Sequence, residues 1–130
     1  INGLMEFLKW AKAKNISMAV CTNKQEHLAI DLLKKLKMYE YFEYVAGSDT
    51  FPFNKPDPRH LTDVVEIIQG DLKKTIMVGD SEVDGMSAEN AKIPFVLVKD
   101  GYTEKSTKEI KHNELIEDFK NFDKVIEKYL

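Results

Sequence analysis

Residues 77–86 read MVGDSEVDGM, which places an apolar pair, a glycine and three carboxylates within ten residues. The carboxylates belong to Asp80, Glu82 and Asp84. Like charges this close raise one another's pKa and lower stability unless a cation or a set of hydrogen bonds compensates them. The stretch therefore has two interpretations: its acids cap a turn, or they form part of a metal site.

Short apolar runs alternate with amphipathic segments on both sides of this stretch. We predict strands at 16–21, 44–46, 75–78 and 95–98, and helices at 2–14, 28–36, 61–68 and 84–90. Segment 47–58 holds three of the four prolines and is predicted as a loop. After residue 114 the pattern favours a closing amphipathic helix, with an edge strand over 115–119 as the alternative.

This order of elements predicts an α/β fold: a Rossmann-like, three-layer α/β/α core with a mainly parallel sheet. No repeat, low-complexity stretch or linker interrupts residues 1–130, so we expect one domain. The net charge of −3 and the lack of a basic cluster argue against a nucleic-acid partner. No apolar run approaches the roughly 18 residues of a membrane span, and the single cysteine, Cys21, fits a cytoplasmic protein.

Polar residues follow three of the predicted elements: Thr22 and Asn23 after the first strand, Lys55 within the loop, and Asp80 after the third strand. Taken singly, each has a simpler explanation, because Thr22 and Asn23 can cap the next helix, Lys55 can be a solvated charge and Asp80 a turn residue. In open parallel sheets, however, ligands bind beyond the carboxyl ends of the strands. We therefore expect these residues to lie at one rim.

Together these residues supply a hydroxyl, an amide, an ammonium and a carboxylate. A phosphate is bound by donors such as Thr22 and Asn23 together with a fixed cation such as Lys55. Mg²⁺ prefers one or two carboxylates and keeps its other positions for water and phosphate oxygens. The set therefore predicts a magnesium–phosphate site.

Four stretches in this order resemble the haloacid dehalogenase superfamily, and most closely its phosphoglycolate-phosphatase-like branch. They are VCTNK at 20–24, NKPDP at 54–58, IMVGDSEVDGMSAENAKIPFVLV at 76–98, and Gly101-Tyr102. The resemblance implies Mg²⁺-dependent hydrolysis of a small phosphorylated metabolite. It also implies roles: Thr22, with Asn23 beside it, binds phosphate, Lys55 neutralises it, Asp80 is the metal ligand, and Asp84 orients a metal-bound water. Glu82 receives no role from the family and is interpreted as a solvent-facing residue of the first helical turn.

The family's Asp-x-Asp-Gly-Thr motif does not occur in these 130 residues. In the family its first Asp forms an aspartyl-phosphate and its second acts as general acid and base. We therefore expect this chain to be the C-terminal part of a phosphatase, lacking the nucleophile, the first strand and the cap, and inactive by itself. The alternatives are a non-catalytic phosphate-binding fragment and a receiver module, although a receiver orders its Asp, Thr and Lys differently.

In the family the absent strand lies between the strands that end here at Cys21 and Val78. An empty slot would leave several buried backbone groups unpaired, each costing about 1–3 kcal/mol. We therefore predict that the slot is closed by direct pairing, which would draw Thr22 and Asp80 together. Otherwise it is filled, by the missing N-terminal segment or by a strand from another molecule.

Two smaller features complete the expectations. Lys92 stands where the family usually has a glycine after the helix, and it predicts an altered helix ending, because a left-handed lysine costs roughly 1 kcal/mol. His27, His60 and His112 lie apart with no metal-ligand spacing and are expected at surface or helix positions.

Overall fold

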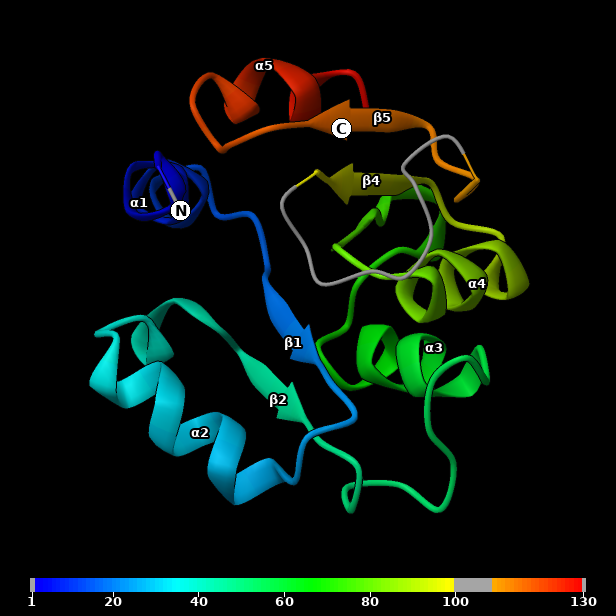
Figure 1. Cartoon of the computed structure of the whole chain (residues 1–130). Helices are drawn as coiled ribbons and strands as arrows, with labels where there is room; N and C mark the ends of the chain where they lie inside the picture. Colours follow the sequence, from blue (N-terminus) through cyan, green and yellow to red (C-terminus); the bar gives the residue numbers. More distant parts are fainter. Residues whose placement is uncertain (1, 100–108, 130) are drawn as a thin grey trace.

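A computed structural model describes residues 2–99 and 109–129 as an alternation of strands and helices (Figure 1). In chain order the elements are α1 (Leu4–Ala13), β1 (Ala19–Cys21), α2 (Glu26–Lys35), β2 (Tyr44–Ala46), α3 (Arg59–Ile67), β3 (Met77–Gly79), α4 (Glu82–Ala91), β4 (Phe95–Val98), β5 (Glu114–Ile116) and α5 (Phe122–Glu127). Short 3₁₀ helices occupy Tyr39–Tyr41 and Leu72–Lys74. Gly101 and Tyr102 lie outside the described residues.

All of the predicted strands and helices are present, with their ends shifted by a few residues. The two alternatives for the tail are both realised, since a short strand, β5, precedes the closing helix α5. One detail is wrong: Thr22 and Asn23 do not cap the second helix, because α2 begins at Glu26, after Gln25. None of the helices in the described part of the chain is long and apolar enough to cross a membrane.

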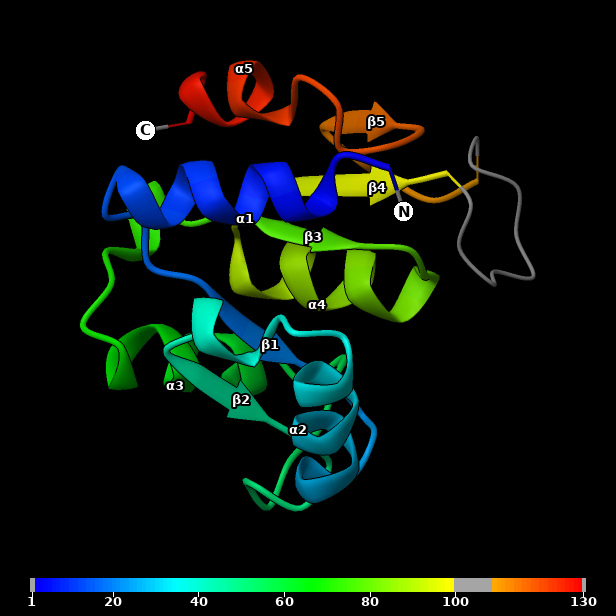
Figure 2. The ribbon, with the colours of Figure 1, turned by 90° about the vertical axis from the view of Figure 1, so that its left-hand side faces the viewer.

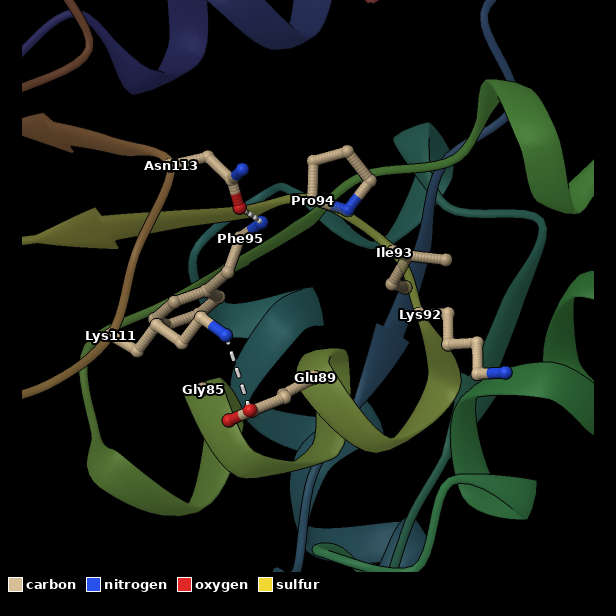
Figure 3. A pocket seen from close by; sticks show the side chains of 8 residues that line it. All are labelled: Gly85, Glu89, Lys92, Ile93, Pro94, Phe95, Lys111 and Asn113. Carbon is tan, nitrogen blue, oxygen red and sulfur yellow. Dashed lines mark hydrogen bonds and ion pairs between the residues drawn. The ribbon is translucent and has the colours of Figure 1, made fainter.

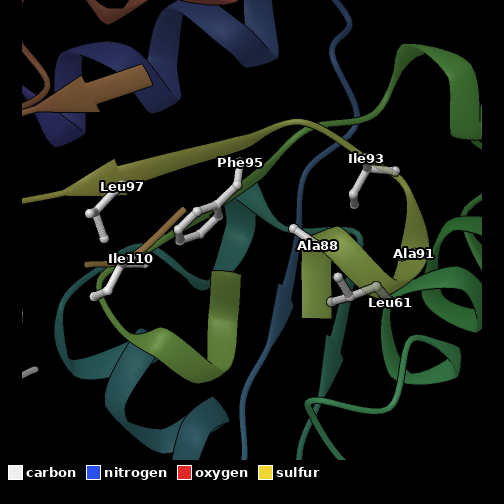
Figure 4. Close-up of a cluster of buried hydrophobic side chains, with 7 residues drawn as sticks. All are labelled: Leu61, Ala88, Ala91, Ile93, Phe95, Leu97 and Ile110. Carbon is white, nitrogen blue, oxygen red and sulfur yellow. The ribbon is translucent and has the colours of Figure 1, made fainter. Parts of the chain in front are cut away.

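Strand β4 is buried along its whole length and divides its side chains between two cores. Because successive side chains of a strand point to opposite faces, Phe95 and Leu97 lie on one side and Val96 and Val98 on the other. The first pair joins a cluster against α3 and α4 (Figure 4), completed by Leu61, Ala88, Ala91, Ile93 and Ile110. The second pair packs with Phe119, Phe122 and Ile126 under α1 and α5.

Helices therefore cover both faces of this sheet, with α1 and α5 on one side and α4 on the other (Figure 2). The aromatic rings of the second core meet edge to face: Phe119 and Phe122 have centroids 5.1 Å apart, and Phe7 and Phe122 4.7 Å apart. This arrangement confirms the expected α/β class with parallel strands and helical layers.

The parallel strands form two separate sheets, ordered β1–β2 and β3–β4–β5. Val20 is in register with Val45, Val78 with Val96, and Leu97 with Leu115. Within the described residues no hydrogen bond joins β1 to β3. The slot is thus not closed by direct pairing of β1 with β3, and that part of the prediction is wrong. That a segment outside these 130 residues fills the slot stays a prediction.

The expectation of direct pairing assumed that β1 and β3 are fully buried in this chain. The three residues of each strand are only half-buried, whereas all of β4 is buried. The free-energy penalty for an unpaired amide applies to groups removed from water, so an edge that water can reach does not incur it. Within the described residues, half-buried β1 and β3 therefore do not require direct pairing with each other.

The end of α4 also differs from the expectation. Lys92 keeps the left-handed conformation, with φ 60° and ψ 40°, and the Ile93 amide donates to the Ala88 carbonyl oxygen at 3.0 Å. The helix ending is therefore not altered by the lysine. The hydrogen bonds of the cap, together with burial of Ile93 in the core, hold the backbone in a shape that glycine adopts more readily.

Lys92→Gly should therefore raise the free energy of unfolding by about 1 kcal/mol, because glycine has no Cβ to strain a left-handed backbone. The matched control is Lys9→Gly in the middle of α1, which should lower it by about the same amount. Urea denaturation of both variants measures the difference. Equal destabilisation by the two glycines would contradict the argument.

Candidate functional site

The candidate site lies where β1 and β3 end. The first strand continues directly into Thr22 and Asn23, and the third into Asp80. Figure 2 shows the two sheets with the carboxyl ends of these strands directed to the same side of the molecule. The loop that follows β2 brings Lys55 to this side as well, where it meets the first turn of α4.

An ion pair between Lys55 and Asp84 is the central contact of the site. The ammonium Nζ donates to Asp84 Oδ1, and the two side chains are only 9% and 10% exposed. The other carboxylate oxygen, Oδ2, accepts from the backbone N–H of Asp80 at 3.2 Å. Asp84 is therefore held from both sides, by the loop and by the turn after β3.

Asn23 reaches the same loop from the first sheet. Its Nδ2 donates to the backbone carbonyl oxygen of Lys55 at 3.1 Å. The Thr22 hydroxyl accepts from the Lys24 amide at 3.1 Å, and within the described residues no hydrogen bond links it to Lys55, Asp80 or Asp84. The structure thus connects Asn23, Lys55, Asp80 and Asp84 in one series of contacts, with Thr22 adjacent in sequence only.

Asp80 and its neighbours begin helix α4. Ser81 caps the helix by accepting a hydrogen bond from the Asp84 amide at 3.2 Å, so the capping function falls to a hydroxyl and not to the acids. The Asp80 side chain is exposed, while Glu82 is half-buried in the first turn. The carboxylate of Asp80 is thus turned to solvent beside the compensated carboxylate of Asp84.

Gly79 makes this arrangement possible by its lack of a side chain. A Cβ at this position would stand 2.4 Å from Asp84 Oδ2 and 2.6 Å from its Cγ. The carboxylate therefore occupies the space that any other residue would fill. The sequence gives no separate signal for this role, because a glycine after a strand is also an ordinary turn residue.

The donor set suits Mg²⁺ better than a metal bound entirely by protein. The described residues contain no group of three or more His, Cys, Asp or Glu side chains able to hold a metal ion. Mg²⁺ needs only one or two carboxylates when water and phosphate oxygens complete its octahedron. Asp80 has the free carboxylate that this requires, and Asp84 lies next to it with one oxygen committed to Lys55.

A hollow of about 340 Å³ lies elsewhere, along α4 at Gly85 and Glu89 and beside Lys92, which follows the helix (Figure 3). Its far wall includes Lys111, which pairs with Glu89 at 3.3 Å, and Asn113, which accepts from the Phe95 amide at 2.9 Å. The hollow shares no residue with the series formed by Asn23, Lys55, Asp80 and Asp84. The hollow is therefore separate from the candidate magnesium–phosphate site.

Burial shifts the pKa of two further side chains near the site. Burial raises the pKa of the Cys21 thiol to about 12, which makes it unreactive and agrees with a packing role. Burial is also the main cause that lowers the pKa of His60. His60 is on a helix as expected, yet it is fully buried, and its spacing in the sequence gave no sign of that.

The family of the chain follows from comparison with known proteins. Residues 1–98 match haloacid dehalogenase-like hydrolases, and this chain belongs to that family. A phosphoglycolate phosphatase of Agrobacterium fabrum (strain C58) is 43% identical over 117 residues, which are 90% of this chain and 50% of that protein. One of Caulobacter vibrioides is 41% identical over 102 residues, 78% of this chain and 43% of its own length.

Solved structures agree with this assignment. The crystal structure of a predicted phosphoglycolate phosphatase from Haemophilus somnus 129PT superposes with a TM-score of 0.90 at 25% identity, covering 95% of this chain and 56% of that one. A subfamily IA hydrolase from Geobacter sulfurreducens gives 0.81 at 27% identity, covering 95% and 59%. The chain spans about half the length of the curated relatives it matches.

Gly79→Ala should displace the Asp84 carboxylate, because the new methyl group would occupy its position. We expect Mg²⁺ affinity, measured by titration calorimetry on the full-length protein, to fall by roughly tenfold or more, the effect of losing one well-placed polar contact. Gly70→Ala is the control, since the nearest atom to its added Cβ is a Val65 methyl at 3.2 Å. Unchanged Mg²⁺ binding in Gly79→Ala would contradict the role given to Asp84.

Proposed function

We propose that this chain provides the magnesium- and phosphate-binding part of a phosphoglycolate-phosphatase-type enzyme that hydrolyses small phosphate monoesters. The observation that carries the proposal is the Lys55–Asp84 ion pair beside the exposed carboxylate of Asp80. The likeness to phosphoglycolate phosphatases over 90% of the chain supports the substrate class.

The charges of the site support a metal-dependent reaction. Lys55 and Asp84 neutralise each other, which leaves the negative charge of Asp80 uncompensated. A phosphate dianion would be repelled from such a site unless a cation offsets the carboxylates. Mg²⁺ would be held by Asp80, with Asp84 orienting its water, and it would polarise the phosphoryl oxygens of the substrate.

The remaining residues of the chain position the phosphate. Lys55 places a fixed positive charge at the rim, where negative charge on the transferring phosphoryl group can be stabilised without reorganisation. Asn23 donates a hydrogen bond to the Lys55 backbone carbonyl and so fixes the position from which the Lys55 side chain extends. The Thr22 hydroxyl can still donate its proton to a phosphate oxygen, because its oxygen acts as the acceptor toward Lys24.

The nucleophile of the proposed reaction lies outside these 130 residues. The sequence contains no Asp-x-Asp-Gly-Thr motif, whose first Asp would form the aspartyl-phosphate. The proposal therefore concerns the full-length protein, and a chain that binds phosphate without turnover is the alternative. Its activity, its cytoplasmic location and its Mg²⁺ dependence belong to the same proposal.

Lys55→Ala and Asp80→Asn should each abolish most of the phosphatase activity of the full-length protein. Loss of the fixed ammonium should lower kcat by roughly 10²-fold or more. Asp80→Asn should weaken Mg²⁺ binding, so that added Mg²⁺ restores part of the activity. The exposed Lys9 on α1, replaced by Ala, serves as the control. Full activity in both site variants would refute the assigned roles.

The isolated 130-residue chain should show no phosphatase activity, because it lacks the nucleophile. The assay uses phosphoglycolate and a generic aryl phosphate in the presence of Mg²⁺. Turnover by the isolated chain that Asp80→Ala abolishes would mean that the chemistry resides within these residues and that the assignment of the nucleophile is wrong.

A further inference from the structure

His60 is a fully buried polar residue to which the proposed chemistry gives no role. It is the second residue of α3, and its Nε2 lies 3.1 Å from the carbonyl oxygen of Gly47. A carbonyl oxygen can only accept, so Nε2 must carry a proton, and in the neutral imidazole Nδ1 is then bare. Nδ1 is buried and has no hydrogen-bond partner within the described residues. The imidazole is thus held as one neutral tautomer by a single hydrogen bond.

Gly47, the partner of His60, is packed tightly against the turn that follows β1. Its amide donates to the Thr50 hydroxyl at 2.7 Å, and the next amide, that of Ser48, donates to the Lys24 carbonyl at 2.8 Å. A Cβ at Gly47 would stand 2.3 Å from the backbone nitrogen of Glu26. Displacing Gly47 would therefore displace the turn that carries Thr22 and Asn23.

The loop from 47 to 58 runs between these two partners. It leaves the sheet at Gly47 and returns at α3, so the bond between His60 and Gly47 closes it across 13 residues. Lys55 lies near its end, and its backbone carbonyl is bound by Asn23. Phe51, in the middle of the loop, meets the His60 ring edge on, with centroids 5.6 Å apart. His60 thus contacts the start of the loop at Gly47 and the middle of the loop at Phe51. Helix α3, which carries His60, begins directly after the loop.

We propose that His60 is a positioning residue: through its hydrogen bond to Gly47 it fixes the loop that carries Lys55 against the turn that carries Thr22 and Asn23. This inference rests on the proposed function, because it assigns His60 an effect on anion binding at that site. His60 itself touches no reacting group.

Protonation of His60 would destabilise this arrangement, although the Nε2–H bond to Gly47 would remain. The second N–H, at Nδ1, would be buried without an acceptor, a loss comparable to that of a hydrogen bond. The charged and titratable groups facing His60 are Lys55, which opposes protonation, Asp57, which favours it, and the neutral Cys21 thiol near its backbone carbonyl. Burial outweighs the favourable contacts, so the folded pKa lies below the ordinary value of about 6.5.

The sign of the pH effect follows from the lowered pKa. Above about pH 6.5 His60 is neutral in the folded and unfolded states, and its contribution to the stability of the folded state is fully present. As the pH falls toward the lowered folded pKa, the unfolded protein takes up a proton that the folded one resists, and stability is lost. The loop should therefore be less stable at mildly acidic pH.

The experiment compares His60→Leu with His60→Gln in the full-length protein. Leucine fills a similar volume without a donor, whereas the glutamine amide can still donate to Gly47. His27→Leu, at an exposed histidine on α2, is the control for the substitution itself. The first readout is amide hydrogen exchange of residues 47–54, and the second is binding of sulfate, a dianion throughout pH 5–8, in the presence of Mg²⁺.

We expect His60→Leu to accelerate exchange of the loop and to weaken sulfate binding by roughly tenfold, the effect of one lost hydrogen bond. His60→Gln should stay close to the wild type, as should His27→Leu. Between pH 7 and pH 5 the wild type should lose protection of the loop, relative to intrinsic exchange rates, while His60→Gln retains it. Equal exchange in the leucine and glutamine variants would overturn the proposal.

Two outcomes separate this inference from the proposed function. If the full-length protein has no phosphatase activity, the exchange of residues 47–54 still decides the role of His60. If the enzyme is active and the leucine variant exchanges like the wild type, the inference fails and the function stands. Should His60→Leu not fold, the comparison of wild type with His60→Gln over pH decides, and parallel pH profiles would overturn the proposal.

Discussion

The ion pair between Lys55 and Asp84 is the contact on which the geometry of the site depends. The two sheets share no hydrogen bond within the described residues, so side-chain contacts must hold them in place. The pair joins the loop of one sheet to the first turn of α4 beside the other, and Asn90 adds a hydrogen bond to the Pro56 carbonyl at 3.2 Å. Breaking a buried pair by removing one partner typically destabilises a protein by about 3–5 kcal/mol.

The hydrophobic packing on both faces of β4 supports the Lys55–Asp84 ion pair. One face of the strand joins the cluster under α3 and α4, and the opposite face joins the aromatic cluster under α1 and α5. Cys21 of β1 and Met77 of β3 also pack against the first cluster. The two sheets are therefore connected through a shared hydrophobic core and not through their edges. Helix α4, which packs on that core, carries Asp84, and the loop that leads into α3 carries Lys55.

Two glycines at strand ends permit the close approaches that the site requires. Gly79 ends β3 and leaves room for the Asp84 carboxylate, while Gly47 follows β2 and lets the loop lie against Glu26. At Gly79 the Asp84 carboxylate occupies the space and accepts from the Asp80 amide, whereas at Gly47 the backbone of Lys24 and Glu26 occupies it. The site is thus shaped as much by absent side chains as by those present.

The sequence by itself determined the order of strands and helices and the residues that follow the strands. Alternating apolar runs predicted the parallel α/β class, and the strand-end motifs predicted that Thr22, Asn23, Lys55 and Asp80 lie at one rim. The role of Asp84 came from the family resemblance alone. Such features are local, because side-chain periodicity and turn residues act over a few positions along the chain. Even the tail was foreseen as two alternatives that turned out to coexist.

Only the tertiary structure decided how these parts meet. The tertiary structure did not pair β1 with β3, and the residues of both strands are half-buried, although their apolar sequences resemble those of buried strands. The burial of His60, its bond to Gly47 and the pairing of Asp84 with Lys55 depend on contacts between residues 13 and 29 positions apart. No local pattern encodes them, because burial and charge pairing are set by whatever the folded chain brings alongside.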